Sequence, residues 1–131
     1  MYQGEMTMDQ ATIGYVNIFV TDFDRAVKFY RDQVGLEVLN EDAAFGYASF
    51  ATRGAGFAIA AVSPDSDQAD LAGRHTGIGW IVDDVDKAYE SLRENGVTFA
   101  QPPTKQPWGG YMAMMQDPDG NVFYLDSLRQ H

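Results

Sequence analysis

Hydrophobic and polar positions alternate along the chain with two different periods, which show where strands and helices are expected. Residues 13–20 alternate between two faces, one formed by Val16, Ile18 and Val20 and the other by Tyr15, Asn17 and Phe19. After Thr21 and Asp22, both good helix caps, the apolar residues follow helical spacing as far as Val34. The pattern therefore predicts a strand followed by a helix, which Gly35 ends.

This succession of elements occurs twice. Three strands are expected after the first helix, near residues 36–40, 45–51 and 57–62, followed by a polar, acidic segment from Ser63 to Gly73. The pattern then restarts with a strand over 77–82, a helix over 84–95, a short strand over 97–100, a proline-rich loop over 101–108 and a hairpin over 109–126. The hairpin closes around Asp117-Pro118-Asp119-Gly120, with proline and glycine at the second and fourth turn positions.

The restart is an internal repeat. A shift of 62 positions aligns Asp22 with Asp84 and Ala26 with Ala88. Later in the chain, Phe57-Ala58-Ile59 aligns with Phe123-Tyr124-Leu125 at a shift of 66. Each unit of roughly 55 residues is too small to bury a good core alone, so the two units must share one, within the chain or between chains. We expect one α+β domain, divided into a flexible N-terminal arm (1–11), a first module (12–62), a linker (63–74) and a second module (75–128).

The composition of the chain disfavours some classes of partner and excludes chemistry that depends on cysteine. The net charge of −10 disfavours nucleic acid as a partner, because binding a polyanion relies on Lys and Arg, and it favours a cationic small molecule or simply a soluble surface. The absence of cysteine excludes disulfides, thiolate catalysis and cysteine-ligated metal. No 18-residue apolar run or signal-peptide pattern is present, so we expect a cytoplasmic protein that does not enter a membrane.

Several motifs, in order, resemble the vicinal oxygen chelate superfamily, which includes glyoxalase I, bleomycin-resistance proteins and extradiol dioxygenases. The resemblance rests on residues 15–22 with Ala26 and Phe29-Tyr30, on Val34-Gly35-Leu36, on residues 82–86, on Pro107-Trp108-Gly109 and on residues 117–121. It extends from about Thr12 to Asp126. It implies two tandem βαβββ modules whose curled mixed sheets form a cup around a ligand, and it implies a homodimer.

In metal-dependent members of that superfamily, four positions in the cup hold His, Glu or Gln and bind one divalent ion. The resemblance places these positions at Tyr15, Ala58, Gly77 and Tyr124, none of which is a good ligand for such an ion. His75 and Asp126 lie two residues from the third and fourth positions, but they offer too few donors together. We therefore expect no divalent metal and no other cofactor, and metal-dependent glyoxalase or dioxygenase activity is disfavoured.

Strand alternation predicts which residues face the cup. The expected ligand-binding residues are Tyr15, Asn17, Ala58, Gly77, Trp108 and Tyr124. Small residues next to two phenols leave room for a flat organic ligand that stacks and makes a few hydrogen bonds. Three alternatives stay open: the small residues serve close packing, Tyr15 and Tyr124 plug the cup, or Trp108 is structural.

Three functions compete on these grounds. The first is metal-independent binding or sequestration of a small, cationic or aromatic molecule, as in the bleomycin-resistance branch. The second is a family enzyme (lyase, isomerase or dioxygenase) that uses an atypical metal site or acid–base groups, although no catalytic residue is identifiable. The third is an accessory or regulatory role with a degenerate site.

Overall fold

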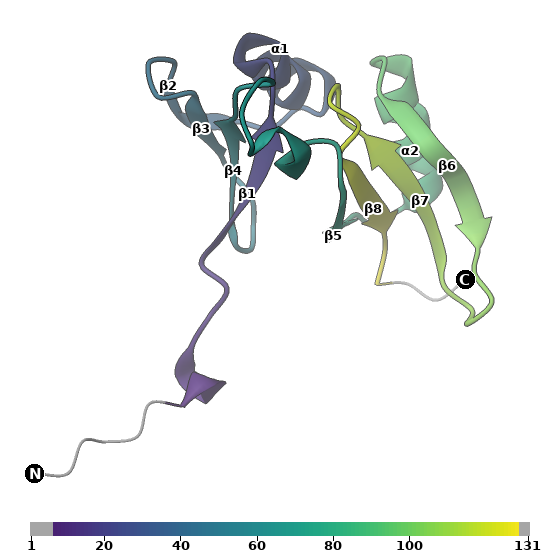
Figure 1. Cartoon of the computed structure of the whole chain (residues 1–131). Helices are drawn as coiled ribbons and strands as arrows, with labels where there is room; N and C mark the ends of the chain where they lie inside the picture. The colour runs from purple at the N-terminus through teal and green to yellow at the C-terminus, as the bar shows by residue number, and fades with distance from the viewer. Residues whose placement is uncertain (1–6, 129–131) are drawn as a thin grey trace, which may run out of the picture.

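The computed structural model describes residues 7–128, which fold into two similar modules (Figure 1). The first module contains β1 (Tyr15–Val20), α1 (Phe23–Lys28), a π-helical turn (Phe29–Gln33), β2 (Val38–Asp42), β3 (Tyr47–Phe50) and β4 (Gly56–Ala61). The second contains β5 (His75–Ile81), α2 (Val85–Glu94), β6 (Thr98–Lys105), β7 (Tyr111–Gln116) and β8 (Val122–Asp126). Short 3-10 helices lie before β1 (Met8–Gln10) and before β5 (Ala69–Leu71).

The two sheets have the same mixed topology. Their strand orders are β1-β4-β3-β2 and β5-β8-β7-β6, and in each sheet the first and last strands of the module pair in parallel while the other pairs are antiparallel. The sheets are curled and do not close. This confirms the predicted α+β fold with two βαβββ modules, and it leaves β1 and β5 as edge strands.

The repeat extends to the helix caps. The side chains of Asp22 and Asp84 accept hydrogen bonds from the backbone N–H groups of Arg25 and Lys87, so both modules begin their helix in the same way. The first helix differs from the predicted one because it widens into a π turn at residues 29–33. Two adjacent aromatic residues of this turn, Phe29 and Tyr30, are both buried.

The predicted proline-rich loop over 101–108 is wrong for residues 101–105, because β6 continues through Pro102-Pro103 as far as Lys105, and the loop occupies residues 106–110. β6 lies at the edge of its sheet, where a residue without an N–H group costs no ladder hydrogen bond. The pairing with β7 also shifts register around Gln101. The strand bends there, and the two prolines fit without ending it.

The modules pack against each other through equivalent residues. Gln33 and Asn95, which are 62 positions apart, exchange hydrogen bonds between side-chain amides and backbone carbonyls. The rings of Phe57 and Phe123, also repeat equivalents, have centroids 6.0 Å apart, and Phe57 contacts Trp80 of β5 at 4.9 Å. The two modules of one chain therefore share one core along an approximate two-fold axis.

A polar network fastens the second module's turn to the first module. Asp117 accepts hydrogen bonds from the Tyr30 hydroxyl at 2.7 Å and from the side-chain and backbone nitrogens of Asn121. The Asn121 amide nitrogen also donates to the carbonyl of Phe19, and Asp119 accepts from the Thr21 hydroxyl. The Asp-Pro-Asp-Gly turn is thus a contact between modules as well as a hairpin.

Asp117 predicts a specific pH dependence of stability. Burial raises the pKa of its carboxyl, while the hydrogen bonds from Asn121 and Tyr30 oppose that shift. A carboxyl whose folded pKa exceeds its unfolded value holds its proton better in the folded chain. Its contribution to the free energy of unfolding therefore falls as pH rises from about 4, near the unfolded pKa, through the folded pKa. Urea titrations between pH 4 and 7 should show this slope, and Asp117→Asn should remove it, whereas Asp65→Asn in the exposed linker should not. An unchanged slope in Asp117→Asn would contradict the assignment.

The N-terminal arm and the linker, which the domain prediction places outside the two modules, differ in how they are attached. Residues 1–6 of the predicted arm lie outside the described residues, and residues 7–14 run away from both modules (Figure 1). The linker is tied at its end, because the backbone N–H groups of Gly73 and Arg74 donate to the Asn121 side-chain oxygen. None of the described helices is long and apolar enough to span a membrane.

Candidate functional site

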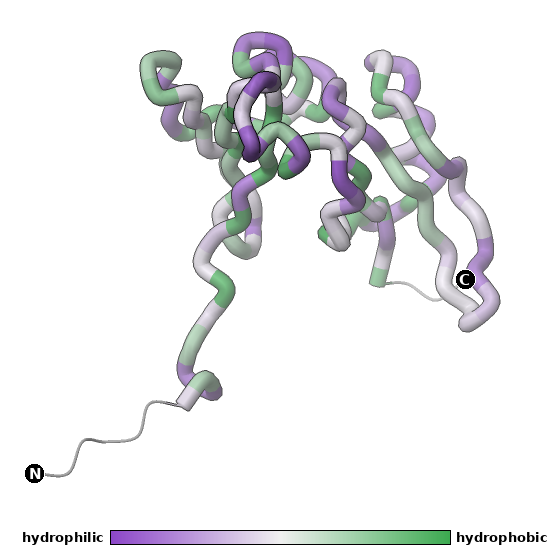
Figure 2. Tube along the Cα trace, in the orientation of Figure 1, coloured by the Kyte–Doolittle hydropathy of each residue, from purple (hydrophilic) through white to green (hydrophobic). Residues whose placement is uncertain are grey.

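Each sheet has a core-facing side and a side that looks away from the core, as strand alternation predicts. On the core-facing side, Ile18, Val20, Phe57, Ile59 and Phe123 are buried in the shared core, and Val16, Ile78 and Trp80 pack against it. Leu125 is buried in a smaller cluster within the second module, against which Val82 packs. In Figure 2 the strands next to α1 are accordingly rich in hydrophobic positions. Because the core-facing sides of both sheets meet each other, the two cup-facing sides are directed away from their common core.

Three predicted ligand-binding residues lie together on the cup-facing side of the first sheet. Asn17 of β1 is directly opposite Ala58 of β4, and Tyr15 lies two residues earlier on β1. Tyr15 is 67% exposed, whereas Ala58 is 2% exposed. Tyr47 and Ser49 of β3 pair with Ala60 and Ala58, so they share this face.

The other three predicted ligand-binding residues belong to the second module; they are Gly77, Trp108 and Tyr124. Gly79 of β5 pairs with Tyr124 of β8, and Gly77 lies at an irregularity of that pairing. Gly77 has φ +74°, a backbone conformation that favours glycine. This conformation accounts for glycine at position 77 whether or not the residue contacts a ligand. Gly79 differs, since a Cβ there would meet only Tyr124 at 3.8 Å. Trp108 lies between β6 and β7 and is 72% exposed.

A cavity of about 470 Å³ lies between β1 and β5 and connects the two modules. Its lining includes Asn17 and Phe19 from β1 and Arg74 and His75 from the start of β5. The His75 ring lies 4.8 Å from the ring of Tyr124, so Tyr124 is adjacent to this cavity through His75. The structure thus brings Asn17 close to the second module, but Tyr15, Ala58, Gly77 and Trp108 do not line this cavity. The predicted plug is not formed within one chain, because Tyr124 packs on His75 while Tyr15 is exposed.

Two buried side-chain oxygens on the cup-facing sides have no hydrogen-bond partner within residues 7–128. They are Oδ1 of Asn17 in the first module and Oε1 of Gln101 in the second. Gln101 pairs with Met114, which pairs with Tyr124, so it lies on the cup-facing side of its sheet. Most buried acceptors in proteins are satisfied, so both oxygens are suited to a ligand that donates hydrogen bonds.

Gln101, Met114 and Tyr47 were missed as site residues in the sequence. Gln101 was assigned to a loop because the prolines after it were read as the end of the strand. Met114 and Tyr47 were not placed on the cup-facing side. The alternation of β3 and β7 with their neighbours was the signal that could have located them.

The fold and the repeat agree with comparisons to known proteins. A family model described as the glyoxalase/bleomycin resistance protein/dioxygenase superfamily matches residues 12–125. The chain belongs to this superfamily.

Relatives in the superfamily have similar size and structure. A crystal structure of a superfamily member from Sphaerobacter thermophilus DSM 20745 is 33% identical, with a TM-score of 0.74, covering 89% of this chain and 97% of that chain. TnmS3, an antibiotic binding protein from Streptomyces sp. CB03234, is 30% identical, with a TM-score of 0.73 and coverage of 92% and 98%. The uncharacterized protein YetH of Bacillus subtilis (strain 168) is 28% identical over 116 residues, covering 86% of this chain and 95% of YetH.

The residues at the superfamily's metal positions do not fit a divalent ion. Tyr15, Ala58, Gly77 and Tyr124 supply two phenols and no carboxylate or imidazole. Within residues 7–128, no three His, Asp or Glu side chains are grouped to hold a metal ion. The Nδ1 atom of His75 accepts a hydrogen bond from the Gly77 N–H group, so that nitrogen is engaged by the backbone. Metal-free action stays a prediction, and no step of a mechanism is derived through a metal.

Proposed function

We propose that this protein binds and sequesters a small organic molecule without a metal ion, in the cavity between β1 and β5 that joins its two modules. The observation that carries the proposal is the buried, unpartnered Oδ1 of Asn17, which borders the 470 Å³ cavity. Cavities of about 300–1,000 Å³ with few polar groups are typical of small-molecule sites. The superfamily relationship and the antibiotic-binding relative TnmS3 support the same reading.

The chemistry of the site favours a ligand that is aromatic and donates hydrogen bonds. Asn17 offers an acceptor beside the cavity, and His75 and Tyr124 offer ring faces. Gln101 offers a further acceptor on the cup-facing side of β6, at the sheet edge away from this cavity. The net charge of −10 attracts a cation over distance. Planar aromatic amines and ammonium compounds combine these properties.

A homodimer is part of this proposal. The strands β1 and β5 are free edges beside the cavity, and unpaired edges favour association. Tyr15, Ile81 and Trp108 are large exposed hydrophobic residues on or next to the cup-facing sides. Within one chain these sides are directed away from the core, so a second copy is needed to complete an enclosed cup. Sedimentation equilibrium should therefore give twice the monomer mass. A cytoplasmic location stays a prediction.

The binding proposal is tested by calorimetry with proflavine, a planar aromatic cation with N–H donors. We expect Asn17→Ala to weaken proflavine binding at least about tenfold, because the ligand loses an acceptor in a desolvated site. The thermal stability of the free protein should be unchanged or slightly higher, since an unpaired buried oxygen is removed. Asn40→Ala, on the exposed part of β2, is the matched control and should bind like the natural chain.

Two results would overturn the proposal. One is a panel of aromatic cations and antibiotics in which no compound raises the melting temperature. The other is a stoichiometric divalent ion that stays bound when the purified protein is dialysed. That result would favour the alternative of a family enzyme with an atypical metal site.

A further inference from the structure

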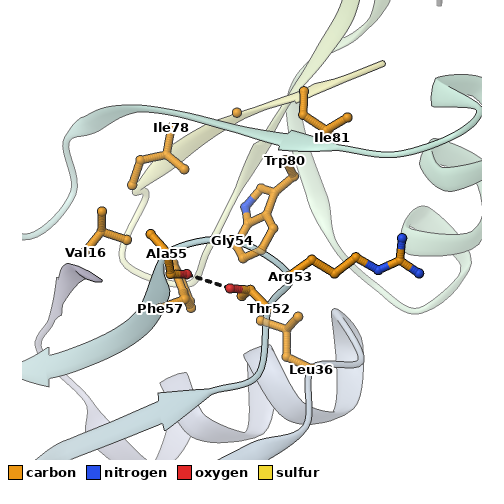
Figure 3. Close-up of a pocket in the computed structure, with 11 residues that line it drawn as sticks. Val16, Leu36, Thr52, Arg53, Gly54, Ala55, Phe57, Ile78, Trp80 and Ile81 are labelled. Atoms are coloured by element: carbon orange, nitrogen blue, oxygen red, sulfur yellow. Dashed lines mark hydrogen bonds between the residues drawn. The ribbon is translucent and has the colours of Figure 1, made fainter. Parts of the chain in front are cut away.

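A second cavity lies beside the first one, and Val16 and Ile78 line both cavities. It has a volume of about 400 Å³ and lies between the turn that joins β3 to β4 and the strand β5 (Figure 3). Its apolar lining comes from both modules and includes Val16, Leu36, Phe57, Ile78 and Trp80. Four of these belong to the core-facing side of their strands, and Thr52 to Ala55 complete the lining on the side away from the first cavity.

The cavity contains an unsatisfied donor. The indole of Trp80 projects from β5 among the lining residues (Figure 3), and its Nε1 atom is buried without a hydrogen-bond partner in the described part of the chain. A buried N–H group without an acceptor costs roughly 1–3 kcal/mol, and few native groups are left in that state. The hydroxyl of Thr52, which also lines the cavity, donates to the carbonyl of Ala55 within the same turn.

The charges around the cavity indicate an uncharged ligand. Arg53 is at the rim, but its guanidinium points away from the apolar residues (Figure 3) and is exposed to solvent. The strongly acidic chain repels anions. The buried Nε1 of Trp80, which has no partner among the described residues, is a donor, and a cation with only donors cannot satisfy it. A neutral molecule with a carbonyl oxygen satisfies the indole and fills the apolar walls.

We propose that this cavity is a second binding site, which takes an uncharged planar ketone or lactone whose carbonyl oxygen accepts a hydrogen bond from the Trp80 indole. The site adjoins the first cavity but differs from it in polarity, because the first cavity is bordered by the unpartnered oxygen of Asn17 and this cavity by the unpartnered donor of Trp80. It does not depend on the proposed function of the cup.

The two tryptophans of the chain make the test direct. In a ¹⁵N–¹H spectrum each indole gives one signal, and Trp108→Phe assigns them. We expect flavone, a planar uncharged ketone, to move the Trp80 indole proton downfield and to leave the exposed Trp108 signal in place. A Trp80 signal that does not respond to saturating flavone would overturn the proposal.

Two substitutions distinguish the contribution of the Trp80 hydrogen bond from the contribution of the cavity volume. Trp80→Phe keeps an aromatic ring against Phe57 but removes the donor, and it should weaken flavone binding about tenfold. Leu36→Phe keeps the donor but takes volume from the cavity, and it should weaken flavone binding while the Trp80 signal persists as evidence of folding. Phe45→Leu, which changes an exposed ring that lines neither cavity, is the matched control and should bind flavone normally.

Proflavine binding distinguishes a failure of the second-site proposal from a failure of the proposed function. Asn17→Ala should affect proflavine but not flavone, and Trp80→Phe should affect flavone but not proflavine. If dilution of the free protein shifts the Trp80 indole signal as a dimer dissociates, a second copy covers the indole and the small-molecule site is refuted. An unchanged signal on dilution, together with a flavone response, supports it.

Discussion

Phe123→Ala is expected to lower the free energy of unfolding by about 3–5 kcal/mol, the usual range for deleting a fully buried aromatic ring. The ring is fully buried in β8 and lies against Tyr30 and Phe57 of the first module and Trp80 of the second. Its removal therefore leaves a cavity in the core that the modules share. Because single domains are stable by only about 5–15 kcal/mol, this substitution should place the protein close to unfolding at room temperature.

The matched control is Phe45→Ala. Phe45 lies in the turn between β2 and β3 and is 84% exposed, so its replacement should change stability by less than about 0.5 kcal/mol. Urea unfolding followed by circular dichroism measures both. If Phe123→Ala produced two separate transitions instead of one shifted transition, the modules would have independent cores, contrary to the contacts between them.

The repeat allowed most of the fold to be predicted from the sequence. Alternation with a period of two located the strands, and the equivalent Asp22 and Asp84 marked where both helices begin. The loop predicted after Ala100 was wrong for residues 101–105 because proline was treated as a breaker. A strand's position in its sheet decides whether proline is tolerated, and that position depends on pairing between distant segments.

The candidate site was harder to predict, because its geometry depends on how the modules meet. Alternation correctly separated core-facing from outward-facing residues, but it could not show that the two outward sides diverge within one chain. The contact between His75 and Tyr124 and the unpartnered oxygen of Gln101 depend on side-chain positions across three strands. Gly77 illustrates the same limit, since its backbone conformation is not visible in the pattern of hydrophobic and polar residues.

Asn121→Ala is expected to cost about 3 kcal/mol or more, although it deletes only one small polar side chain. Asn121 is 1% exposed, and its amide joins three segments that are distant in the sequence. The nitrogen donates to the carbonyl of Phe19 at 2.9 Å, and the oxygen accepts from the backbone N–H groups of Gly73 and Arg74. Truncation leaves these partly buried backbone groups without partners, and each such loss costs roughly 1–3 kcal/mol.

Asn121→Ala should also weaken the contact between the two modules. The Asn121 nitrogen donates to Asp117 at 2.8 Å, and the Tyr30 hydroxyl is the other side-chain donor to that carboxylate. Burial and the adjacent carboxylate raise the pKa of the Tyr30 phenol, so Tyr30 continues to donate after Asn121 is lost. Amide hydrogen exchange at Gly73 and Arg74 should therefore accelerate more than exchange in the middle of β8. Asn40→Ala, which removes an exposed asparagine from β2, is the control for both measurements. A loss of stability as small as that of the control would show that the Asn121 hydrogen bonds do not fasten the second module to the first.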